Sequence, residues 1–475
     1  MKSIGFRFLK KSVKSISQRN LYYKIRPSRF LVDASHTLPS GLNSGVQRVV
    51  RNTCKYVPLV VSDLQTEVVV SSSKGFQPVS SAKKTPLQAK VQGLKNNIVA
   101  HLPKIYVRTA DLLCQHFQSA KLKSWLLPQP GHRGIFRLPI KFLDAIVPRD
   151  RTSLLADIGS KDVLLLPDAY WAHEEVWAPV VQARSNGAYV VSIVYDLIPL
   201  THPNFVAAKA PESFRRYIKQ VARYSDMIVA ISNTVRDEIV QALPNLLPGE
   251  KYCTDIRSFQ LGAEFSQSEA VVRPIVKEIF REDSVDCPYL MVATFDPRKN
   301  HSYLLDAFER IWQKDPTRKL CLIGRVGWLC DDVIDRITKH ERYGQQLFML
   351  NDASDSELNY CYARARAIVF PSIVEGFGLP IVEALWHGRY VFASNTAIHR
   401  EVGTSECYYF DLADPMSLAN QIIEWEKCQT QISPSKRTDI RPLAWQQSIE
   451  YLVHQCLDGY SQRDEPSAYR PRAAA

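Results

Sequence analysis

Short runs of apolar residues alternate with stretches of helical periodicity along most of the chain. In the first half these runs lie at residues 30–35, 163–167, 188–200 and 226–232. Apolar runs of this length without polar alternation are typical of parallel strands that are buried on both faces. The pattern therefore predicts a doubly wound α/β domain over residues 30–265.

The second half repeats this pattern. Its apolar runs lie at residues 289–295, 319–324, 347–351, 367–372 and 390–394, and helical patterns separate them. They predict a second parallel-sheet domain over residues 288–442.

The remaining segments give weaker signals. Residues 266–287 are polar and non-periodic and are expected to be a linker, whereas residues 63–160 are basic and irregular and predict no elements. The amphipathic pattern at residues 445–457, within a C-terminal segment over 443–472, predicts a helix that packs apart from the second core. We exclude Ala473–Ala475, which resembles a vector scar.

Composition agrees with a two-domain globular protein. The chain has 475 residues, of which 45% are hydrophobic and 23% are charged, so two cores are expected. Because no apolar run is long enough for a spanning helix and no leader pattern opens the chain, we expect a cytoplasmic protein. The ten cysteines form neither a CxxC pair nor a Cys/His cluster, which predicts reduced thiols and no metal site.

The net charge of +12 is unevenly distributed, because nine basic residues precede the first acidic one, Asp33. Wound as a helix, residues 1–29 would place apolar and basic side chains on opposite faces near their start, as in a helix that lies on an anionic membrane surface. A solubilising tail is the equally supported alternative. Nucleic acid is a weaker interpretation, because no zinc-finger or RNP-type signature accompanies the charge.

The strongest chemical motif is PSIVEGFGLPIVEALWHG at residues 371–388. Gly376 and Gly378 allow close approach of the backbone to a ligand, and the helix that begins near Pro380 offers free N–H groups to a phosphate. Glu375 and Glu383 can face the same pocket, where carboxylates accept hydrogen bonds from sugar hydroxyls.

This motif resembles the Glu-x7-Glu element of the retaining glycosyltransferases of family 4, the glycosyl transferases group 1. The resemblance implies the GT-B fold, in which two Rossmann-like domains face each other across a cleft. It also implies that the C-terminal helix, within residues 443–472, crosses back to the first domain. It implies that Glu383 holds the ribose of the nucleotide and that Glu375 contacts the donor sugar. Gly376, Phe377, Gly378 and Leu379 would complete the donor loop.

Two cations follow the first strand of the second domain. Arg298 and Lys299 lie at the sheet edge where parallel sheets bind ligands, and they suit a diphosphate. The segment is similar to the family's Glu-Pro-Arg-Lys-Asn mannosyltransferase-like variant, which implies that Lys299 neutralises the leaving diphosphate. Thr294 occupies the place of an arginine that many relatives carry, and Arg298 is expected to compensate for it.

The first domain carries a second set of family-like residues. Residues 44–52 resemble the family's acceptor-side glycine loop and helix, which implies that Gly45 and Arg48 contact the acceptor. Residues 194–203 resemble a segment with His-Asp near the reacting centre, but Tyr195 stands at the histidine position and Asp196 keeps the aspartate. Asp196 is expected either to order the reacting centre or to cap the following turn.

The resemblance implies a retaining transfer that needs no metal and no cofactor other than the nucleotide-sugar donor. The favoured donor is GDP-mannose. The favoured acceptor is a saccharide, expected to be lipid-linked, in bacterial O-antigen or capsule synthesis at the inner face of the cytoplasmic membrane. Two alternatives stay open: a sugar phosphorylase or epimerase with the same architecture, and a scaffold subunit without turnover, to which Tyr195 points.

Overall fold

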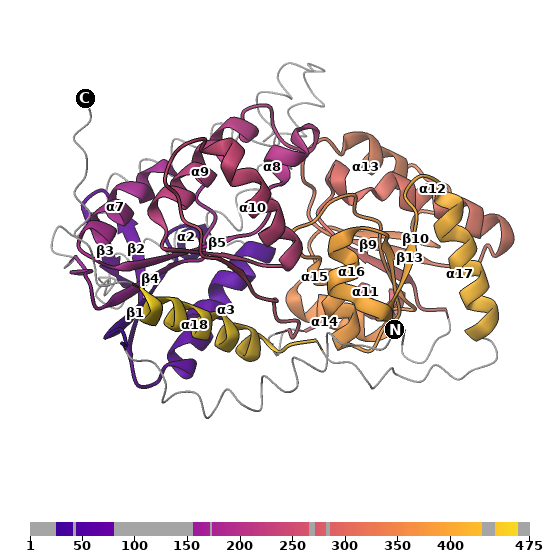
Figure 1. The fold of residues 1–475 in the computed structure, drawn as a ribbon. Coiled ribbons are helices and arrows are strands. Elements are labelled where there is room, and N and C mark those ends of the chain that lie inside the picture. Colours follow the sequence, from indigo (N-terminus) through magenta and orange to yellow (C-terminus); the bar gives the residue numbers. More distant parts are fainter. Residues whose placement is uncertain are drawn as a thin grey trace, which may run out of the picture. The chain divides into compact units, whose positions relative to one another are not determined.

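The computed structural model describes residues 25–40, 44–79, 155–171, 173–265, 271–281, 286–429 and 442–463. The basic arm up to residue 24, most of the basic segment 63–160 and the C-terminal alanines lie outside the described residues. Two parallel sheets, each covered by helices, account for most of the described chain (Figure 1).

The first sheet has seven strands in the order β3-β2-β1-β4-β5-β6-β7, a doubly wound arrangement with β1 and β4 at its centre. Its strands are β1 (Arg29–Asp33), β2 (Gln65–Ser72), β3 (Gly75–Pro78), β4 (Asp162–Leu166), β5 (Tyr189–Val194), β6 (Met227–Ala230) and β7 (Ile256–Ser258). The helices of this part are α2 (Thr37–Ser40), α3 (Gly45–Val60), α7 (Trp177–Ser185), α8 (Ile198–Thr201), α9 (Ala210–Tyr224) and α10 (Asn233–Leu246).

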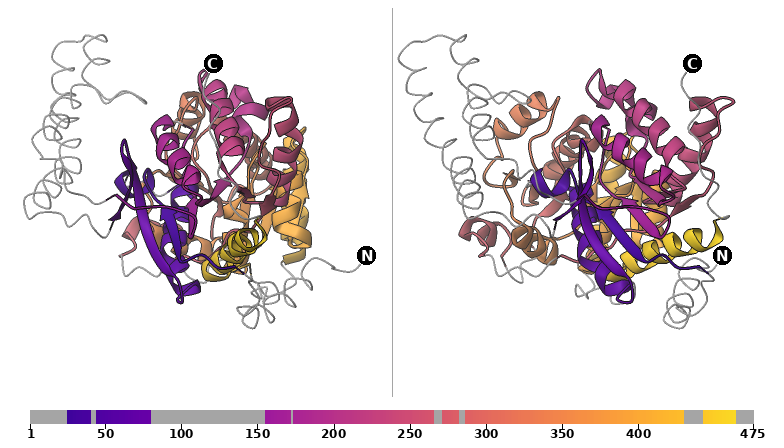
Figure 2. Two further views of the ribbon diagram at one scale, coloured as in Figure 1. Left: turned by 60° about the vertical axis from the view of Figure 1, so that its left-hand side comes forward. Right: turned by 90° about the vertical axis from the view of Figure 1, so that its left-hand side faces the viewer.

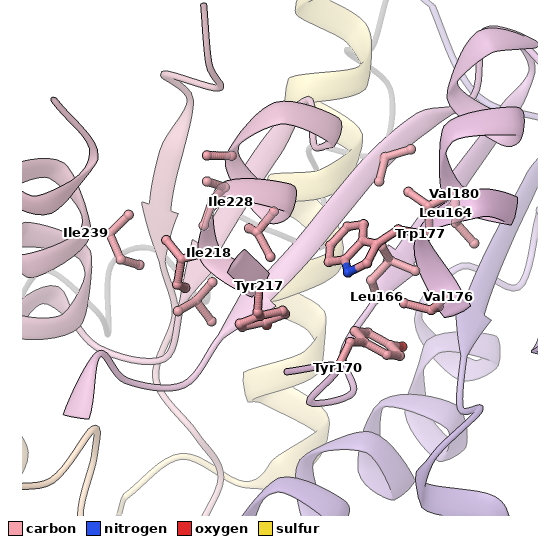
Figure 3. Packing of buried hydrophobic residues seen from close by; sticks show 14 of the residues in the cluster. Leu164, Leu166, Tyr170, Val176, Trp177, Val180, Tyr217, Ile218, Ile228 and Ile239 are labelled. Carbon is pink, nitrogen blue, oxygen red and sulfur yellow. The ribbon is translucent and has the colours of Figure 1, made fainter. Parts of the chain in front are cut away.

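The side chains of successive residues in the central strands pack on opposite faces of this sheet. On β4, Leu164 and Leu166 pack against α7, α9 and α10, whereas Val163 and Leu165 pack against α3 and α18 (Trp445–Gln462). Side chains alternate across a strand, so burial on both faces requires an unbroken apolar run. Figure 3 shows the first of these two layers, with Trp177 and Tyr217 beside Leu164 and Leu166.

Helix α18 comes last in the described chain, yet it lies against the first sheet, beside α3 (Figures 1 and 2). Its side chains Trp445, Ile449 and Leu452 are buried in the same cluster as Phe30 of β1. Gly262 permits this packing, because a Cβ there would lie 2.5 Å from the backbone of Trp445. The chain therefore returns to its first core after completing the second.

The second sheet has six strands in the order β10-β9-β8-β11-β12-β13. Its strands are β8 (Tyr289–Val292), β9 (Leu320–Ile323), β10 (Leu347–Leu350), β11 (Ile368–Phe370), β12 (Val391–Ser394) and β13 (Cys407–Phe410). Its helices are α11 (Pro274–Ile279), α12 (His301–Lys314), α13 (Asp331–Thr338), α14 (Asp355–Arg364), α15 (Leu379–Trp386), α16 (Ala397–Gly403) and α17 (Pro415–Gln429).

Two sequence expectations differ from the structure. The segment 63–160, in which the sequence placed no element, begins with β2 and β3. Their mixed polar and apolar residues are mostly only partly buried and so give no continuous apolar run. The expected linker 266–287 contains α11, in which Val276 is buried against the second sheet. This helix has six residues, too few for helical periodicity to stand out.

Candidate donor and acceptor site

A pocket of about 520 Å³ lies where the carboxyl edges of the two sheets meet. Parallel sheets bind ligands at these edges, because the loops after the strands converge there. Residues from 44 to 49 and the end of β5 line one wall, and the loops after β8, β9, β10 and β11 line the other. All the residues that the sequence assigned to the site line this pocket: Gly45, Arg48, Tyr195, Asp196, Thr294, Arg298, Lys299, Glu375, Gly376, Phe377, Gly378, Leu379 and Glu383.

Glu375 is the centre of a buried charge cluster. Its carboxylate accepts a hydrogen bond from Arg298 Nη1 at 2.8 Å and another from Lys299 Nζ. Burial alone would raise the pKa of Glu375, but Lys299 and Arg298 outweigh it and hold that pKa at about 2. The carboxylate is therefore ionised at neutral pH, and without a ligand it neutralises the two cations.

The cations belong to a short 3₁₀ turn, η6 (Pro297–Lys299), directly after β8. Asn300 ends this turn in the left-handed region at φ 60° and starts α12. Burial lowers the pKa of Lys299 more strongly than the Glu375 carboxylate raises it. The turn thus places two cationic groups at the pocket wall where a diphosphate would lie against the second sheet.

Asp196 takes one of the two roles that the sequence left open, the cap of the following turn. Its Oδ1 accepts a hydrogen bond from Ile198 N at 3.0 Å, which caps the turn into α8, and the same residue lines the pocket. Burial raises the pKa of Asp196, against the opposite effect of the Arg298 guanidinium. Tyr195 donates its hydroxyl to the Pro167 carbonyl, so this hydroxyl is already engaged within the first domain.

Gly376 allows the two walls of the pocket to approach each other closely. A Cβ at this position would lie 2.0 Å from the Tyr195 carbonyl oxygen, so only glycine fits. The Gly376 carbonyl also accepts a hydrogen bond from Ser232 Oγ at 2.9 Å. Gly378 takes φ 96°, which an L side chain rarely adopts, and it caps the start of α15.

Glu383 is nearly fully buried on α15, where it accepts a hydrogen bond from Arg48 Nη1. The Arg48 guanidinium also lies over the Phe265 ring, 5.1 Å from its centroid. The sequence assigned Arg48 to the acceptor. The structure instead pairs it with the glutamate assigned to the donor ribose, because α3 begins at the edge that faces α15.

One part of the pocket was missed by the sequence. Asn351, Asp352 and Asp355 line it beyond the end of β10, together with Gly324 and Arg325 after β9. The signal was available, since the apolar runs at residues 319–324 and 347–351 end at these positions and parallel strands share one carboxyl edge. Asp352 also forms an ion pair with Arg273 at 2.8 Å.

A second contact between the two halves lies at the start of α10. The Glu401 carboxylate on α16 accepts hydrogen bonds from Asn233 N at 2.7 Å and from Thr234 N at 2.8 Å. A carboxylate is favourable at this end of a helix, where backbone N–H groups are free and the dipole is positive. The loop after β11 and the helix after β12 thus both form hydrogen bonds with the first domain.

Among the described residues, no group of three or more His, Cys, Asp or Glu side chains is placed to hold a metal ion. Within the same residues, no helix combines the length and apolar character needed to cross a membrane.

Residues 275–442 match the family model described as glycosyl transferases group 1. The chain is similar to the serotype-specific mannosyltransferase WbdA of Escherichia coli, with 28% identity over 306 residues, 62% of this chain and 37% of that protein. It is also similar to the O-antigen chain mannosyltransferase B of Escherichia coli, with 39% identity over 114 residues, 24% of this chain and 30% of that protein. The match thus spans little more than a third of WbdA.

A third relative is the O-antigen chain mannosyltransferase RfbU of Salmonella typhimurium, with 25% identity over 244 residues, 50% of this chain and 62% of that protein. Among solved structures, the Escherichia coli trehalose-6-phosphate protein bound with UDP-2-fluoro glucose has a TM-score of 0.50 at 12% identity, covering 92% of this chain and 97% of that one. This likeness shows the GT-B fold. The second sheet and its half of the pocket, residues 275–442, belong to the glycosyl transferases group 1.

Proposed function

We propose that this chain is a retaining glycosyltransferase that moves a hexose, with mannose from GDP-mannose as the favoured donor, to a saccharide acceptor. The observation that carries the proposal is the pocket wall on which Arg298, Lys299 and Glu375 meet beside Glu383. The names of the relatives support mannose and O-antigen synthesis. A lipid-linked acceptor at the inner face of the cytoplasmic membrane belongs to the same proposal.

In the proposed reaction, the acceptor oxygen forms a bond to C1 of the sugar while the bond from C1 to the diphosphate oxygen breaks. The acceptor proton passes to the departing diphosphate, so no nucleophile from the protein is required. Arg298 and Lys299 stabilise the negative charge that develops on the leaving group. When the donor binds, Arg298 and Lys299 exchange their ion pairs with Glu375 for ion pairs with the diphosphate. The Glu375 carboxylate then accepts hydrogen bonds from the donor sugar.

The acidic end of the pocket supports a guanine base. Guanine presents two neighbouring donors, N1–H and the exocyclic amine, and a carboxylate can accept both. Asp352 and Asp355 line the pocket beyond β10. This chemistry favours GDP over UDP and ADP as the product nucleotide.

Nucleotide binding provides the first test. The wild type and Glu383→Gln are titrated with GDP, UDP, dTDP and ADP, with the melting temperature as the readout, because a ligand that binds the folded state raises it. We expect GDP to stabilise the wild type most and the variant much less. A larger shift with UDP would reject the GDP donor, and no shift with any nucleotide would favour a scaffold without turnover.

Product analysis separates transfer from the alternatives. With GDP-mannose and a mannose oligosaccharide, we expect release of GDP and elongation of the acceptor without added phosphate. The new linkage, read by NMR, should have the α configuration of the donor, which would make the enzyme retaining. A requirement for free phosphate would instead indicate a phosphorylase.

The proposal also holds that the cations on the second sheet take the place of a metal. We therefore expect dialysis against EDTA to leave the transfer rate within about twofold of the untreated enzyme. Addition of Mg²⁺ or Mn²⁺ to the dialysed enzyme is the matched control. A loss of activity that either metal restores would contradict this part of the proposal.

A further inference from the structure

Three ring-bearing side chains outside the pocket lie at the carboxyl edge of the first sheet. Trp171 is 43% exposed, and the rings of His36 and His173 lie with their centroids 4.6 Å apart. His36 follows β1, whereas Trp171 and His173 follow β4, which pairs with β1 in the sheet. We call Trp171, His36 and His173 the aromatic edge.

Two buried carboxylates hold the loops of the aromatic edge in place. Asp33 accepts a hydrogen bond from the Tyr170 hydroxyl, and the Tyr170 ring lies in the core beside Leu166 (Figure 3). His173 N donates to the Tyr170 carbonyl at 2.8 Å, which closes the loop that carries Trp171. These bonds fix the loop to the core of the first domain, while the Trp171 side chain stays exposed to solvent.

The second carboxylate, Asp168, joins the two loops to each other. It accepts hydrogen bonds from His36 N at 3.0 Å and from Thr37 N at 2.7 Å. Asp33 and Asp168 are both fully buried. Loops that are held by such bonds keep one conformation, which reduces the conformational entropy lost when a ligand binds.

A hydrogen bond links the pocket wall to the chain segment that carries Trp171. Tyr195 lines the pocket and donates its hydroxyl to the carbonyl of Pro167, the residue before Asp168. A pocket of about 520 Å³ is of the size that one small ligand fills. An acceptor of several sugars therefore extends out of the pocket. Tyr195 follows β5, and the neighbouring strand β4 leads into the loop that carries Trp171.

The chemistry of the three rings selects the class of ligand. A single exposed aromatic residue is ordinary on a protein surface. Here the His36 and His173 rings are in contact across two loops, and Trp171 stands two positions before His173 in the same anchored loop. A pyranose has an apolar face of C–H groups that packs on an indole, and a rim of hydroxyls that imidazoles can meet as donors or acceptors. Resting on the proposed function, we infer that the aromatic edge is an acceptor subsite, which binds a sugar of the acceptor chain beyond the one that is glycosylated.

Glycan binding tests this subsite without requiring turnover. Mannose and manno-oligosaccharides of two to four residues are titrated by calorimetry, with GDP present, into the wild type and Trp171→Ala. We expect wild-type affinity to rise with chain length. Trp171→Ala should weaken binding of the tetrasaccharide about tenfold while leaving the mannose and GDP affinities unchanged. Trp171→Phe should recover most of the loss, because it restores a ring.

Tyr343→Ala is the matched control, because Tyr343 is a ring of similar exposure, 41%, on the second domain. It should bind every glycan as the wild type does. Tetrasaccharide affinity within twofold of wild type in Trp171→Ala, an equal loss for mannose, or no glycan binding by the wild type would each overturn the subsite. GDP is titrated separately into each protein, so a failure of the proposed donor shows separately from a failure of the subsite.

Discussion

At the scale of single residues, the oppositely charged side chains of the site form ion pairs with one another when no ligand is bound. Glu375 engages both Arg298 and Lys299, and Glu383 engages Arg48. A buried pair of this kind is costly to break by removing one partner, because the other charge is left without compensation. A diphosphate and a ribose can replace these partners, since they offer the same kinds of group.

This exchange predicts a separation of binding from catalysis in Glu375→Gln. The variant loses the anion that occupies Arg298 and Lys299, so we expect it to bind GDP at least as tightly as the wild type. Transfer should fall about 100-fold or more, because the carboxylate no longer contacts the donor sugar. Calorimetry and steady-state kinetics measure the two effects.

Glu424→Gln serves as the control for that experiment, since Glu424 is exposed on α17. It should match the wild type in both measurements. Loss of GDP binding in Glu375→Gln together with loss of activity would contradict the exchange of partners.

A second residue-scale prediction concerns pH and Asp33. Burial raises the pKa of Asp33 to about 7 from an ordinary value of 3.8, although Ser35 and Tyr170 donate hydrogen bonds to it. A raised folded-state pKa contributes stability that is fully present below pH 3.8 and is lost as the pH rises through 7. Asp33→Asn stays neutral, so it should gain stability relative to the wild type between pH 4 and 7, by about 1 kcal/mol per pH unit.

Urea denaturation at several pH values provides the measurement. Asp157→Asn, a change at an exposed carboxylate, serves as the comparison. A constant difference between Asp33→Asn and the wild type across this range would show that Asp33 titrates alike in the folded and unfolded protein.

At the scale of elements, α18 is part of the first core although it follows the second domain in the chain. Trp445 is 1% exposed, and its backbone packs against Gly262. Removing a large buried side chain leaves a cavity that the surroundings fill only in part. The first domain therefore depends on residues that follow the second domain in the chain.

We expect Trp445→Ala to lower the free energy of unfolding by about 3 to 5 kcal/mol. Tyr451→Ala on the same helix should cost less than about 1 kcal/mol, because Tyr451 is 40% exposed. Denaturant unfolding followed by circular dichroism distinguishes the two. Equal losses in both variants would indicate that the helix as a whole, and not its buried face, sets the stability.

At the scale of the whole molecule, the two domains are joined by a few polar contacts around the pocket. Glu401 caps α10 across the domain boundary, and Ser232 bonds to the Gly376 carbonyl. Such contacts fix the distance between the two walls of the pocket, and the proposed transfer depends on that distance.

Glu401→Gln keeps the side-chain size but removes the charge at the helix start. We expect the turnover number to fall about tenfold, with the melting temperature lowered by no more than a few degrees. Glu406→Gln, in the next turn of the chain, is the control. Unchanged turnover in Glu401→Gln would mean that this contact does not set the position of the walls.

Much of the fold followed from local pattern. The central strands were predictable because burial on both faces demands continuous apolar runs, as in β4 and β5. The donor loop was predictable because glycine is required where Gly376 meets the Tyr195 carbonyl and where Gly378 takes a positive φ. Strands β2 and β3 were not predicted, because their partly buried residues mix polar and apolar types and give no continuous apolar run.

The sequence by itself determined the two sheets, the donor loop and the cations that follow β8. Only the tertiary structure decided which charges meet: Arg48 lies 335 positions from Glu383 in the chain, and local pattern carries no signal for a contact of that kind. The same holds for Tyr170, the neighbour of Trp171, on the buried Asp33. The return of α18 to the first core was expected from the family resemblance, because its local pattern predicts only an amphipathic helix. Such contacts depend on strand order and domain packing, which bring together segments that no local period relates.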